Sequence, residues 1–246
     1  KIIVEDYGYQ PHQVHVVGFA RFDGLFENDV KKQSKLLIMP TWRDTLGNHE
    51  RFLKSDYYRS WHNLLTDVTF RQVVSQSGLT ISFILHPNMV QFKKYFEVEG
   101  INLIRQEDLD VQKSIKQASV MITDFSSVAW DFSFLKRPVL YFLFDFESLV
   151  GNRQPHIDFQ TQLPGPIAFT VEQLVANFKQ TFANGFEIGT EYHKRSRAFL
   201  KYKDQNNCNR IYNTVRGAWT LRIALERLLN AHFIQVLWRK FRSSWF

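Results

Sequence analysis

Short apolar runs alternate with helical stretches between residues 36 and 142, and this alternation constrains the fold most strongly. Five runs have the length and character of strands: 36–40, 81–85, 101–104, 120–123 and 138–142. Helices are predicted between them at 56–75, 88–96, 108–117 and 126–135, with Asp108 and Ser126 as N-caps. Repeats of this kind build a parallel sheet, and strands without polar alternation are covered on both faces. The predicted fold class is therefore α/β, with helices on both faces of a parallel sheet.

The sequence on either side of this pattern indicates two further segments. Residues 1–30 are expected to end a preceding domain and to connect it to the α/β domain at 31–215. Residues 216–246 hold six basic residues and one acidic residue, so +5 of the net charge of +7 lies there. Apolar residues recur in this segment at helical spacing, which predicts a helical tail. The rest of the chain is expected to be nearly neutral and to lack a basic stripe.

Several classes of protein and site are excluded by what the chain lacks. A single cysteine, Cys208, cannot form an internal disulfide. No apolar run reaches the roughly 18 residues of a membrane-spanning helix. The glycine-rich motifs that bind ATP phosphates or dinucleotides are missing, and the histidines show no metal-ligand spacing. We expect neither a metal site nor a tightly bound cofactor, and a requirement for a divalent cation stays open.

Polar residues follow three of the predicted strands. In an open parallel sheet, ligands bind beyond the carboxyl ends of the strands, where the chain order reverses. If the strands take the order usual for dinucleotide-binding sheets, the first and fourth are neighbours at that point. Their ends read PTWRD (40–44) and TDFSS (123–127), and the second strand ends at HPN (86–88). We expect these segments to converge on one crevice.

The side chains of these segments suit a phosphate ligand. Ser126 and Ser127 lie at a predicted helix start, where free N–H groups and the helix dipole attract anions. Arg43 offers a planar charged fork, and His86 can donate a hydrogen bond or protonate a leaving group. Each has a structural alternative: Ser126 as an N-cap, Arg43 as a surface arginine and His86 as a capping histidine. Asp145 could hold a ribose or a cation, or cap a helix.

These segments resemble one protein family. PTWRD, HPN and SVMITDFSSVAWDFSFLKRPVLYFLFD (119–145) are similar to the carboxyl-terminal half of the CDP-glycerol:polyglycerophosphate glycerophosphotransferases, which polymerise teichoic acids and related capsule backbones. The last run is the most specific, with an ITDYSS-like turn, an aspartate at Asp131 and a Pro-containing turn at 137–138. GFARFD (18–23) resembles the junction between the two domains of the family. The resemblance covers about residues 17–215.

The resemblance implies a GT-B-type transferase with two facing Rossmann-like domains, of which this chain would be the second. The implied reaction transfers a polyol phosphate, such as glycerol phosphate, from a CDP-activated donor to an acceptor hydroxyl and releases CMP. His86 and Arg43 would be the catalytic residues. The residues that would bind the CDP-linked donor, with the last one supporting the site from its helix, are Thr41, Arg43, His86, Thr123, Asp124, Ser126, Ser127 and Asp131.

Two departures from the family pattern affect these expectations. Phe125 stands where the family usually has tyrosine, so the ring is kept and the hydroxyl is lost. The first domain of the family carries a histidine that serves as the base, and no residue upstream of Gly18 matches it. His12 and His15 are interpreted as surface residues. We therefore expect a missing N-terminal domain to supply the acceptor half, and we expect this chain alone not to polymerise.

The implied partners are a CDP-alcohol donor and a polymer or lipid-linked acceptor of the bacterial cell envelope. Residues 218–246 mix leucines, aromatics and cations in the pattern of a helix at a membrane interface. This predicts contact with an anionic membrane surface and a cytoplasmic location, peripheral at the inner face of the cell membrane. The structural alternative is that 218–231 packs on the transferase core.

Two other functions fit parts of the sequence. A nucleotide-sugar glycosyltransferase of GT-B architecture is the main alternative, because a fold does not determine its chemistry. A nucleic-acid-binding module is the remote one, suggested by the net charge of +7 and the 15% aromatic residues. Because the basic excess is assigned to the tail, we expect no nucleic-acid partner.

Overall fold

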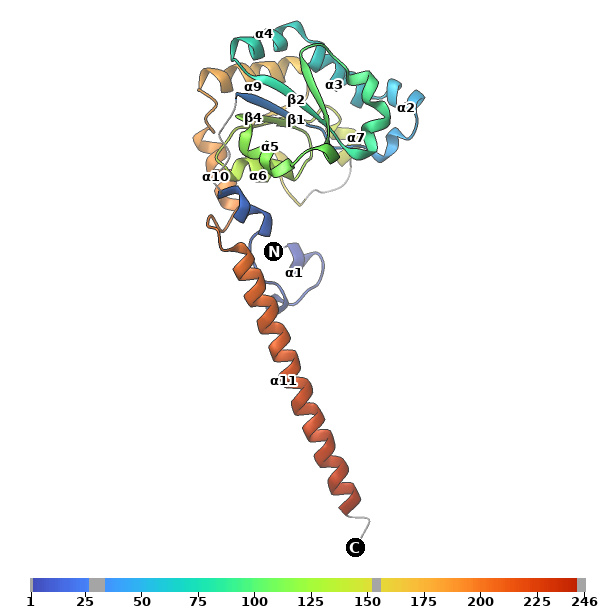
Figure 1. Ribbon diagram of the computed structural model, residues 1–246, viewed down its shortest axis with the longest axis vertical. Helices are drawn as coiled ribbons and strands as arrows, with labels where there is room; N and C mark the ends of the chain where they lie inside the picture. The colour runs from blue at the N-terminus through green and yellow to red at the C-terminus, as the bar shows by residue number, and fades with distance from the viewer. Residues whose placement is uncertain (1, 27–33, 152–155, 243–246) are drawn as a thin grey trace. The chain divides into compact units, whose positions relative to one another are not determined.

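The computed structural model describes residues 2–26, 34–151 and 156–242. Its α/β body contains a parallel sheet in the order β3-β2-β1-β4-β5-β6 (Figure 1). The strands are β1 (Lys35–Met39), β2 (Thr80–Leu85), β3 (Ile101–Arg105), β4 (Val120–Thr123), β5 (Val139–Phe142) and β6 (Ile167–Ala168). The predicted α/β fold class is confirmed, and so is the predicted neighbourhood of the first and fourth strands.

Helices cover both faces of this sheet. Figure 1 shows α3, α4 and α9 over one face and α5 and α6 over the other. The helices of the body are α2 (His49–Lys54), α3 (Asp56–Thr66), α4 (Val68–Gln76), α5 (Val111–Gln117), α6 (Val128–Phe134), α7 (Phe146–Val150), α8 (Phe159–Gln162), α9 (Val171–Ala183) and α10 (Thr190–Phe199). The 3₁₀ segments are η2 (Ala20–Phe26), η3 (Asp44–Leu46), η4 (Pro87–Phe96) and η5 (Gln106–Asp108). This two-sided covering explains the uninterrupted apolar runs of the strands.

Helix boundaries differ from the predictions where an aspartate caps a helix. The single helix predicted at 56–75 is two helices, because Asp67 is extended and its carboxylate accepts the N–H of Phe70 at 2.7 Å, starting α4. The predicted N-cap Asp108 is wrong, since the cap of α5 is Asp110 and Asp108 pairs with Arg105 in a 3₁₀ turn. The first error overlooked Asp67 as a cap inside the predicted helix, and the second came from choosing between Asp108 and Asp110, which are equally good caps by composition.

The sixth strand, β6, was not predicted. It has only two residues, Ile167 and Ala168, which are too few to produce a period in the sequence. It pairs in parallel with β5, with Tyr141 opposite Ile167. The chain reaches it through Gly165, where an added Cβ would lie 1.9 Å from the carbonyl oxygen of Val139. A residue without a side chain is required at this approach.

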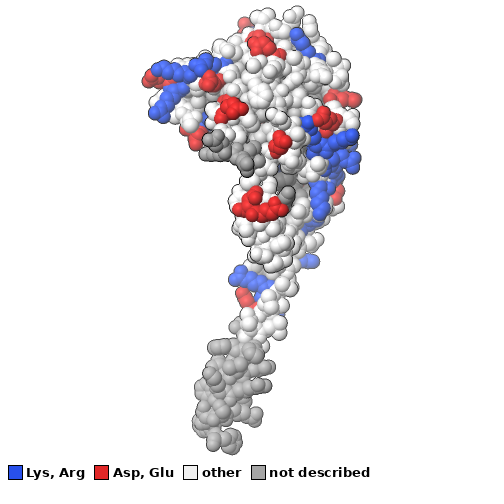
Figure 2. Space-filling model, turned by 180° about the vertical axis from the view of Figure 1, so that it is seen from behind, with Lys and Arg blue, Asp and Glu red and all other residues white. Residues whose placement is uncertain are grey.

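Lysine and arginine residues gather over the side of the α/β body that carries α10 (Figure 2). Residues 190–203 contain five of them and a single acidic residue, Glu191. The expectation of a body without a basic stripe is therefore wrong. The net charge of the body is small because acidic residues elsewhere in it balance the basic residues of this segment. A small net charge therefore did not reveal that the basic residues are clustered.

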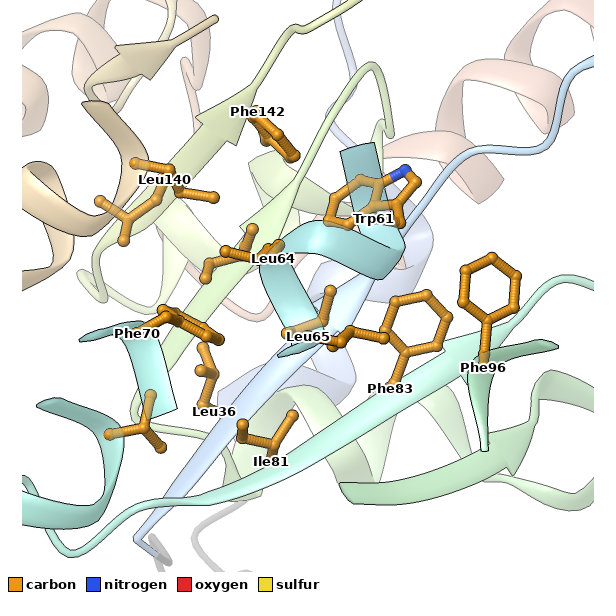
Figure 3. Close-up of a cluster of buried hydrophobic side chains, with 14 of the residues drawn as sticks. Leu36, Trp61, Leu64, Leu65, Phe70, Ile81, Phe83, Phe96, Leu140 and Phe142 are labelled. Atoms are coloured by element: carbon orange, nitrogen blue, oxygen red, sulfur yellow. The ribbon is translucent and has the colours of Figure 1, made fainter. Parts of the chain in front are cut away.

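The main core lies between the sheet and the layer of α3, α4 and α9. Alternate strand residues enter it, such as Leu36 and Ile38 of β1, because successive side chains of a strand point to opposite faces. Trp61 of α3 and Phe70 of α4 meet them from the helix layer, and both are fully buried (Figure 3). Burying each large apolar side chain contributes roughly 1.5–3 kcal/mol, so this cluster is a main source of stability for the sheet that positions the site.

The chain divides into two compact units, Gly24–Lys203 and the pair of segments Lys1–Asp23 and Asp204–Phe246. The second unit contains α1 (Ile2–Glu5), η1 (Pro11–Gln13) and α11 (Asn207–Arg242). Within it, the carboxylate of Asp23 accepts the N–H groups of Asn207 at 3.0 Å and Cys208 at 2.8 Å. Residues distant in sequence are thus joined at the first turn of α11. The functional boundaries expected at residues 30 and 215 stay predictions.

The predicted helical tail is confirmed by α11. Large apolar residues on it are more than half exposed, among them Trp219, Leu221, Leu225, Leu228 and Leu229. In the part of the chain that the structure describes, no helix has the length and apolar character needed to cross a membrane. Residues 243–246 of the predicted tail, with two of its aromatic side chains, lie outside the described residues.

Candidate functional site

The carboxyl ends of β1 and β4 form the point where the chain order reverses. The two strands are parallel neighbours, with Met39 opposite Thr123 at their last paired positions. From here the sheet continues through β2 and β3 on one side and through β5 and β6 on the other. The hydroxyl of Thr123 donates to the carbonyl oxygen of Met39 at 2.6 Å and ties the strand ends together. Ligands of open parallel sheets bind at such a reversal, which makes this edge the candidate site.

Arg43 is the centre of the polar network at this edge. Its Nε donates to Oδ2 of Asp145 at 2.8 Å, and its Nη2 donates to Oδ1 of Asp145 at 3.1 Å and to Oδ2 of Asp124 at 2.9 Å. Its Nη1 donates to the carbonyl oxygen of Thr41 at 2.6 Å. The side chain is only 6% exposed, so the alternative of a surface arginine is wrong. The charged fork is directed at protein acceptors of three loops.

Asp124 is the buried anion beneath this network. It is 0% exposed, and its Oδ1 accepts the N–H groups of Thr41 and Phe125, both at 2.8 Å. With the bond from Arg43, both carboxylate oxygens are occupied by the protein. Asp124 therefore shapes the loops after β1 and β4 and presents no exposed acceptor to a ligand, and Thr123, also 0% exposed, behaves in the same way.

Burial and charge act in opposite directions on this cluster. Burial raises the pKa of Asp124, and the neighbouring Arg43 charge offsets this only in part. Burial lowers the pKa of Arg43. Its hydrogen bond to Asp145 and the charges of the two carboxylates raise the pKa by more than burial lowers it, so the pKa is raised overall. The guanidinium also lies over the rings of Tyr57 at 5.4 Å and Phe125 at 5.3 Å. Arg43 stays charged and is held on all sides.

His86 follows β2 at the same edge. Its Nδ1 accepts the N–H of Asn88 at 3.2 Å, so it caps η4, as the structural alternative for this residue predicted. Because Nδ1 is an acceptor, the proton of the neutral ring lies on Nε2. Within the described ranges Nε2 has no recorded partner, and the ring is half-buried and stacked on Trp42 with centroids 5.9 Å apart. Burial lowers the pKa of His86, which favours this neutral donor form.

The serines at the start of α6 differ in their surroundings. Ser126 is half-buried and its hydroxyl accepts the N–H of Val128 at 3.3 Å, but it is not the N-cap residue, so the predicted N-cap is wrong by one residue. The position that precedes the helix is Ser127, which makes no cap bond and is exposed. Because α6 has only seven residues and one of its first N–H groups is taken by Ser126, its end attracts an anion less than the sequence suggested.

The remaining predicted residues lie below the surface. Thr41 is half-buried and its Oγ1 is a buried atom without a hydrogen-bond partner. Asp131 lies on α6 and is 4% exposed, in keeping with a supporting position. The structure thus brings all eight predicted residues to the carboxyl edge of the sheet or to the helix that follows β4. Of these, Ser127 is exposed and His86, Ser126 and Thr41 are half-buried. In the described chain no group of three or more His, Cys, Asp or Glu side chains is placed to hold a metal ion.

Two surface hollows border the network. One, of about 280 Å³, is lined by residues that include Trp42, Arg43 and Asn88. The other, of about 490 Å³, is lined by residues that include Asp145 and Phe169. The Arg43–Asp145 ion pair borders both of them. A ligand larger than a phosphate therefore has room on either side of the pair.

Sequence reasoning missed two members of this cluster. Asp145 was weighed as a ribose ligand, a cation ligand or a helix cap, but its partner is Arg43 and its side chain makes no cap bond. Tyr57 was assigned only to a helix. In the structure it is a buried residue of α3, and nothing local in the sequence indicated that its ring lies beside a guanidinium.

Comparison with protein families and curated proteins identifies relatives of the chain. Residues 1–217 match the family described as CDP-Glycerol:Poly(glycerophosphate) glycerophosphotransferase. The minor teichoic acid biosynthesis protein GgaB of Bacillus subtilis is 29% identical over 87% of the chain, which covers 25% of GgaB. A teichoic acid poly(glycerol phosphate) polymerase of the same organism is 25% identical over 76% of the chain and 24% of its own length. The chain thus spans about a quarter of these two relatives.

Solved structures share the fold. A variant of the wall teichoic acid polymerase TagF soaked with CDPG has a TM-score of 0.66 and 19% identity, over 90% of this chain and 56% of that one. The Staphylococcus aureus protein MnaA, solved with UDP, has a TM-score of 0.54 and 16% identity, over 88% of this chain and 56% of that one. The first has a GT-B-like fold, in keeping with the predicted architecture. With the family match over most of its length, the chain belongs to the CDP-glycerol:poly(glycerophosphate) glycerophosphotransferase family.

Proposed function

We propose that this chain is the donor-binding part of a transferase that moves glycerol phosphate from CDP-glycerol to a growing teichoic acid. The observation that carries the proposal is the geometry at the β1–β4 reversal. There an Arg43–Asp124–Asp145 network holds three loops, and the half-buried His86 and the exposed Ser127 are left to meet a ligand. The family membership supports the choice of donor.

The reaction that fits this arrangement is displacement at phosphorus. The acceptor hydroxyl attacks the phosphorus that bears glycerol, a new P–O bond forms, the bond to the bridging oxygen breaks, and CMP leaves with that electron pair. The hydroxyl proton goes to a base. Such reactions need positioning and stabilisation of charge more than covalent help from the protein. The N–H of His86 Nε2 is suited to bond an oxygen of the departing phosphate.

The predicted site residues divide into two roles in this proposal. His86, Ser126 and Ser127 would contact the donor directly, since they have exposed surface. Thr41, Arg43, Thr123, Asp124 and Asp131 would act as positioning residues. Four of them are buried and the Oγ1 of Thr41 is a buried atom, and several of their polar atoms already have protein partners. The catalytic role predicted for Arg43 thus becomes one of holding the loops.

The acceptor half of the reaction is proposed to come from a part of the protein outside this chain. The chain matches only about a quarter of its first relatives, so those relatives have ample sequence for a second domain. We propose that this domain carries the base and the polymer site. The exposed leucines and Trp219 of α11, with the basic residues beside them, support a peripheral position at the inner face of the cell membrane.

Calorimetry with CDP, CMP and UDP tests the donor site on the chain as it stands. We expect CDP to bind more tightly than UDP, and Ser127→Ala to weaken CDP binding by about 0.5–1.5 kcal/mol, the usual worth of a hydrogen bond. Ser75→Ala is the matched control, because Ser75 is an exposed serine on α4, outside the candidate site. Preference for UDP would favour a nucleotide-sugar glycosyltransferase and reject the proposal.

A second assay tests the reaction. The full-length protein is incubated with a primed acceptor and CDP-glycerol or CDP-ribitol, and release of CMP is followed. We expect turnover with CDP-glycerol by the full-length protein and none by residues 1–246 alone. Preference for CDP-ribitol would mean that the donor carries ribitol in place of glycerol. Turnover by this chain alone would show that the base lies within it, with His86 the first candidate.

A further inference from the structure

One cluster of basic residues in the α/β body has no part in the candidate site. It consists of Lys136, His193, Arg197 and Lys203, which we call the α10 patch. Lys136 lies two residues after the end of α6, two of the others lie on α10, and Lys203 follows that helix. Figure 2 shows lysines and arginines gathered over the side of the body that carries α10.

The fold holds the α10 patch together by packing α10 on α6. The hydroxyls of Ser133 and Ser196 are buried and lie 3.2 Å apart, and the rings of Trp130 and Phe199 have centroids 4.6 Å apart. Lys136, three residues after Ser133, has a φ of 56°, a left-handed conformation that ends α6 and is costly for a residue with a side chain. The packing of these two helices therefore brings the backbone positions of the patch residues together.

Carboxylates do not neutralise the α10 patch. Some exposed cations elsewhere in the body are paired, as Lys54 is with Glu50 and Arg59 with Asp56. Among the described residues no ion pair is recorded for Lys136, Arg197 or Lys203, and the one acidic residue of α10, Glu191, pairs with Arg195.

The cations of the patch lie close enough to repel one another. Burial lowers the pKa of His193, and Lys203, Lys136 and Arg197 lower it further. Burial likewise lowers the pKa of Lys203, with Arg197 and Lys136 adding to the effect. Like charges held together without counter-charges destabilise the free protein, and a bound anion would relieve this repulsion.

The position of the α10 patch separates it from the donor crevice. Helix α6 begins after the carboxyl end of β4 and leads back to the start of β5, so its last turn and Lys136 lie toward the opposite edge of the sheet. The crevice lies at the carboxyl ends of the strands. A ligand that contacts both places must therefore be long.

We propose that the α10 patch is a docking surface for a linear phosphodiester polymer, which would hold earlier repeats of the chain whose end is extended at the crevice. The proposal rests on the proposed function, because that reaction makes such a polymer. A membrane surface fits less well: Ser196 is the single fully buried residue among 190–199, and the one large exposed apolar side chain there, Phe199, packs on Trp130. A helix that binds a bilayer needs a wide apolar face beside its cations.

The test measures binding of poly(glycerol phosphate) of uniform length to the whole chain. The patch variant is Lys136→Gln/Arg197→Gln/Lys203→Gln. The matched control is Lys94→Gln/Lys113→Gln/Lys179→Gln, which removes the same charge from three exposed lysines on η4, α5 and α9. We expect the patch variant to lose about tenfold in affinity and to show a weaker dependence on salt, and the control to stay within about twofold. Equal losses in both variants, or none in either, would overturn the proposal.

Two other ligands and one spectroscopic measurement sharpen the result. If anionic phosphatidylglycerol vesicles or single-stranded DNA lose binding in the patch variant while the polymer does not, the assignment to the polymer is wrong. In NMR titrations, addition of polymer should raise the pKa of His193, as should Lys203→Gln without polymer. An unchanged His193 with polymer bound would place the polymer elsewhere.

Failure of this proposal is distinguishable from failure of the proposed function. CDP binding is measured on the same variants, and we expect the patch variant to bind CDP as the unmodified chain does. If the unmodified chain does not bind CDP, the donor proposal fails whatever the polymer data show. If CDP binds and the patch variant keeps full polymer affinity, only the docking surface is rejected.

Discussion

Arg43 and Asp145 are 102 residues apart in the chain and form a buried ion pair through two hydrogen bonds, Nε to Oδ2 at 2.8 Å and Nη2 to Oδ1 at 3.1 Å. The pair joins the loop after β1 to the loop after β5, across the end of β4. Asp124, at that end, accepts a third bond from the same guanidinium at 2.9 Å. One side chain thus sets the relative positions of three loops that form the candidate crevice.

The first prediction concerns the stability that this pair supplies. Arg43→Ala should lower the free energy of unfolding by about 3–5 kcal/mol, because it leaves Asp124 buried without a charge partner. Urea denaturation measures the loss. Arg59→Ala is the control, since Arg59 pairs with Asp56 at the surface and should cost at most about 1 kcal/mol. Similar losses for the two variants would show that Arg43 is not a structural centre.

The second prediction concerns His86. Burial lowers its pKa, and a bound pyrophosphate would raise it by favouring the charged ring. Affinity for CDP should therefore rise as pH falls through the pKa of the complex and level off below the pKa of the free protein. His86→Asn should remove this dependence and weaken CDP binding by about 1.5–3 kcal/mol, the worth of a hydrogen bond to a charged group.

Calorimetry across a pH series checks the prediction for His86. Asparagine keeps an acceptor near the position of Nδ1, so the cap of η4 should survive. His49→Asn is the matched control, because His49 is exposed and bonds Tyr95 instead of facing the β1–β4 edge. If the control changes the pH profile as much as His86→Asn does, the effect does not come from the site.

The third prediction concerns Gly165. Its Cβ would lie 1.9 Å from the carbonyl oxygen of Val139, which is backbone and cannot move without disturbing the pairing of β5 and β6. Gly165→Ala should therefore destabilise the protein by about 3 kcal/mol, the upper end of the usual cost of overpacking. Gly217→Ala should instead stabilise the protein by up to about 1 kcal/mol, because Gly217 lies in α11 with open space around it and alanine favours the helix. Thermal denaturation shows whether each variant is more or less stable than the unmodified chain. A change in the same direction for both variants would contradict the prediction.

The fourth prediction concerns acid. Burial raises the pKa of Asp23, but hydrogen bonds from Cys208 and Asn207 lower it more strongly, to about 2 from 3.8. A lowered carboxylate pKa adds stability that is present above the ordinary value and is lost as pH falls from about 4 to about 2. The contact of Asp23 with the start of α11 should weaken over that window.

NMR titration of the Asp23 carboxyl and helical circular dichroism follow this loss. Asp23→Asn should lack the change between about pH 4 and pH 2 and should be less stable at neutral pH, because the amide brings no charge to the N–H groups of Asn207 and Cys208. An acid profile of the variant identical to that of the unmodified chain would show that Asp23 does not hold the helix.

The layers of the body and the location of the candidate site could be predicted from the sequence. Uninterrupted apolar runs indicate strands that are buried on both faces, so β1 to β5 could be predicted from them. The usual order of a parallel sheet of this kind then placed the carboxyl ends of β1 and β4 side by side. The family motifs lie on these same strand ends, which is why a local pattern pointed to His86, Ser127 and Asp124. These features depend on periodicity and on local spacing, both of which are written in the chain.

Tertiary structure alone decided which polar groups face outward. Whether Arg43 meets a ligand or Asp145 depends on a loop 102 residues away, and no local pattern specifies that partner. The two-residue β6 exists only because β5 offers it an edge. The α10 patch arises because packing of α10 on α6 brings Lys136 near Arg197 and Lys203, although a count of charge along the chain showed a nearly neutral body. Burial and charge clustering are set by distances in space, and those distances follow from how the helices pack on the sheet.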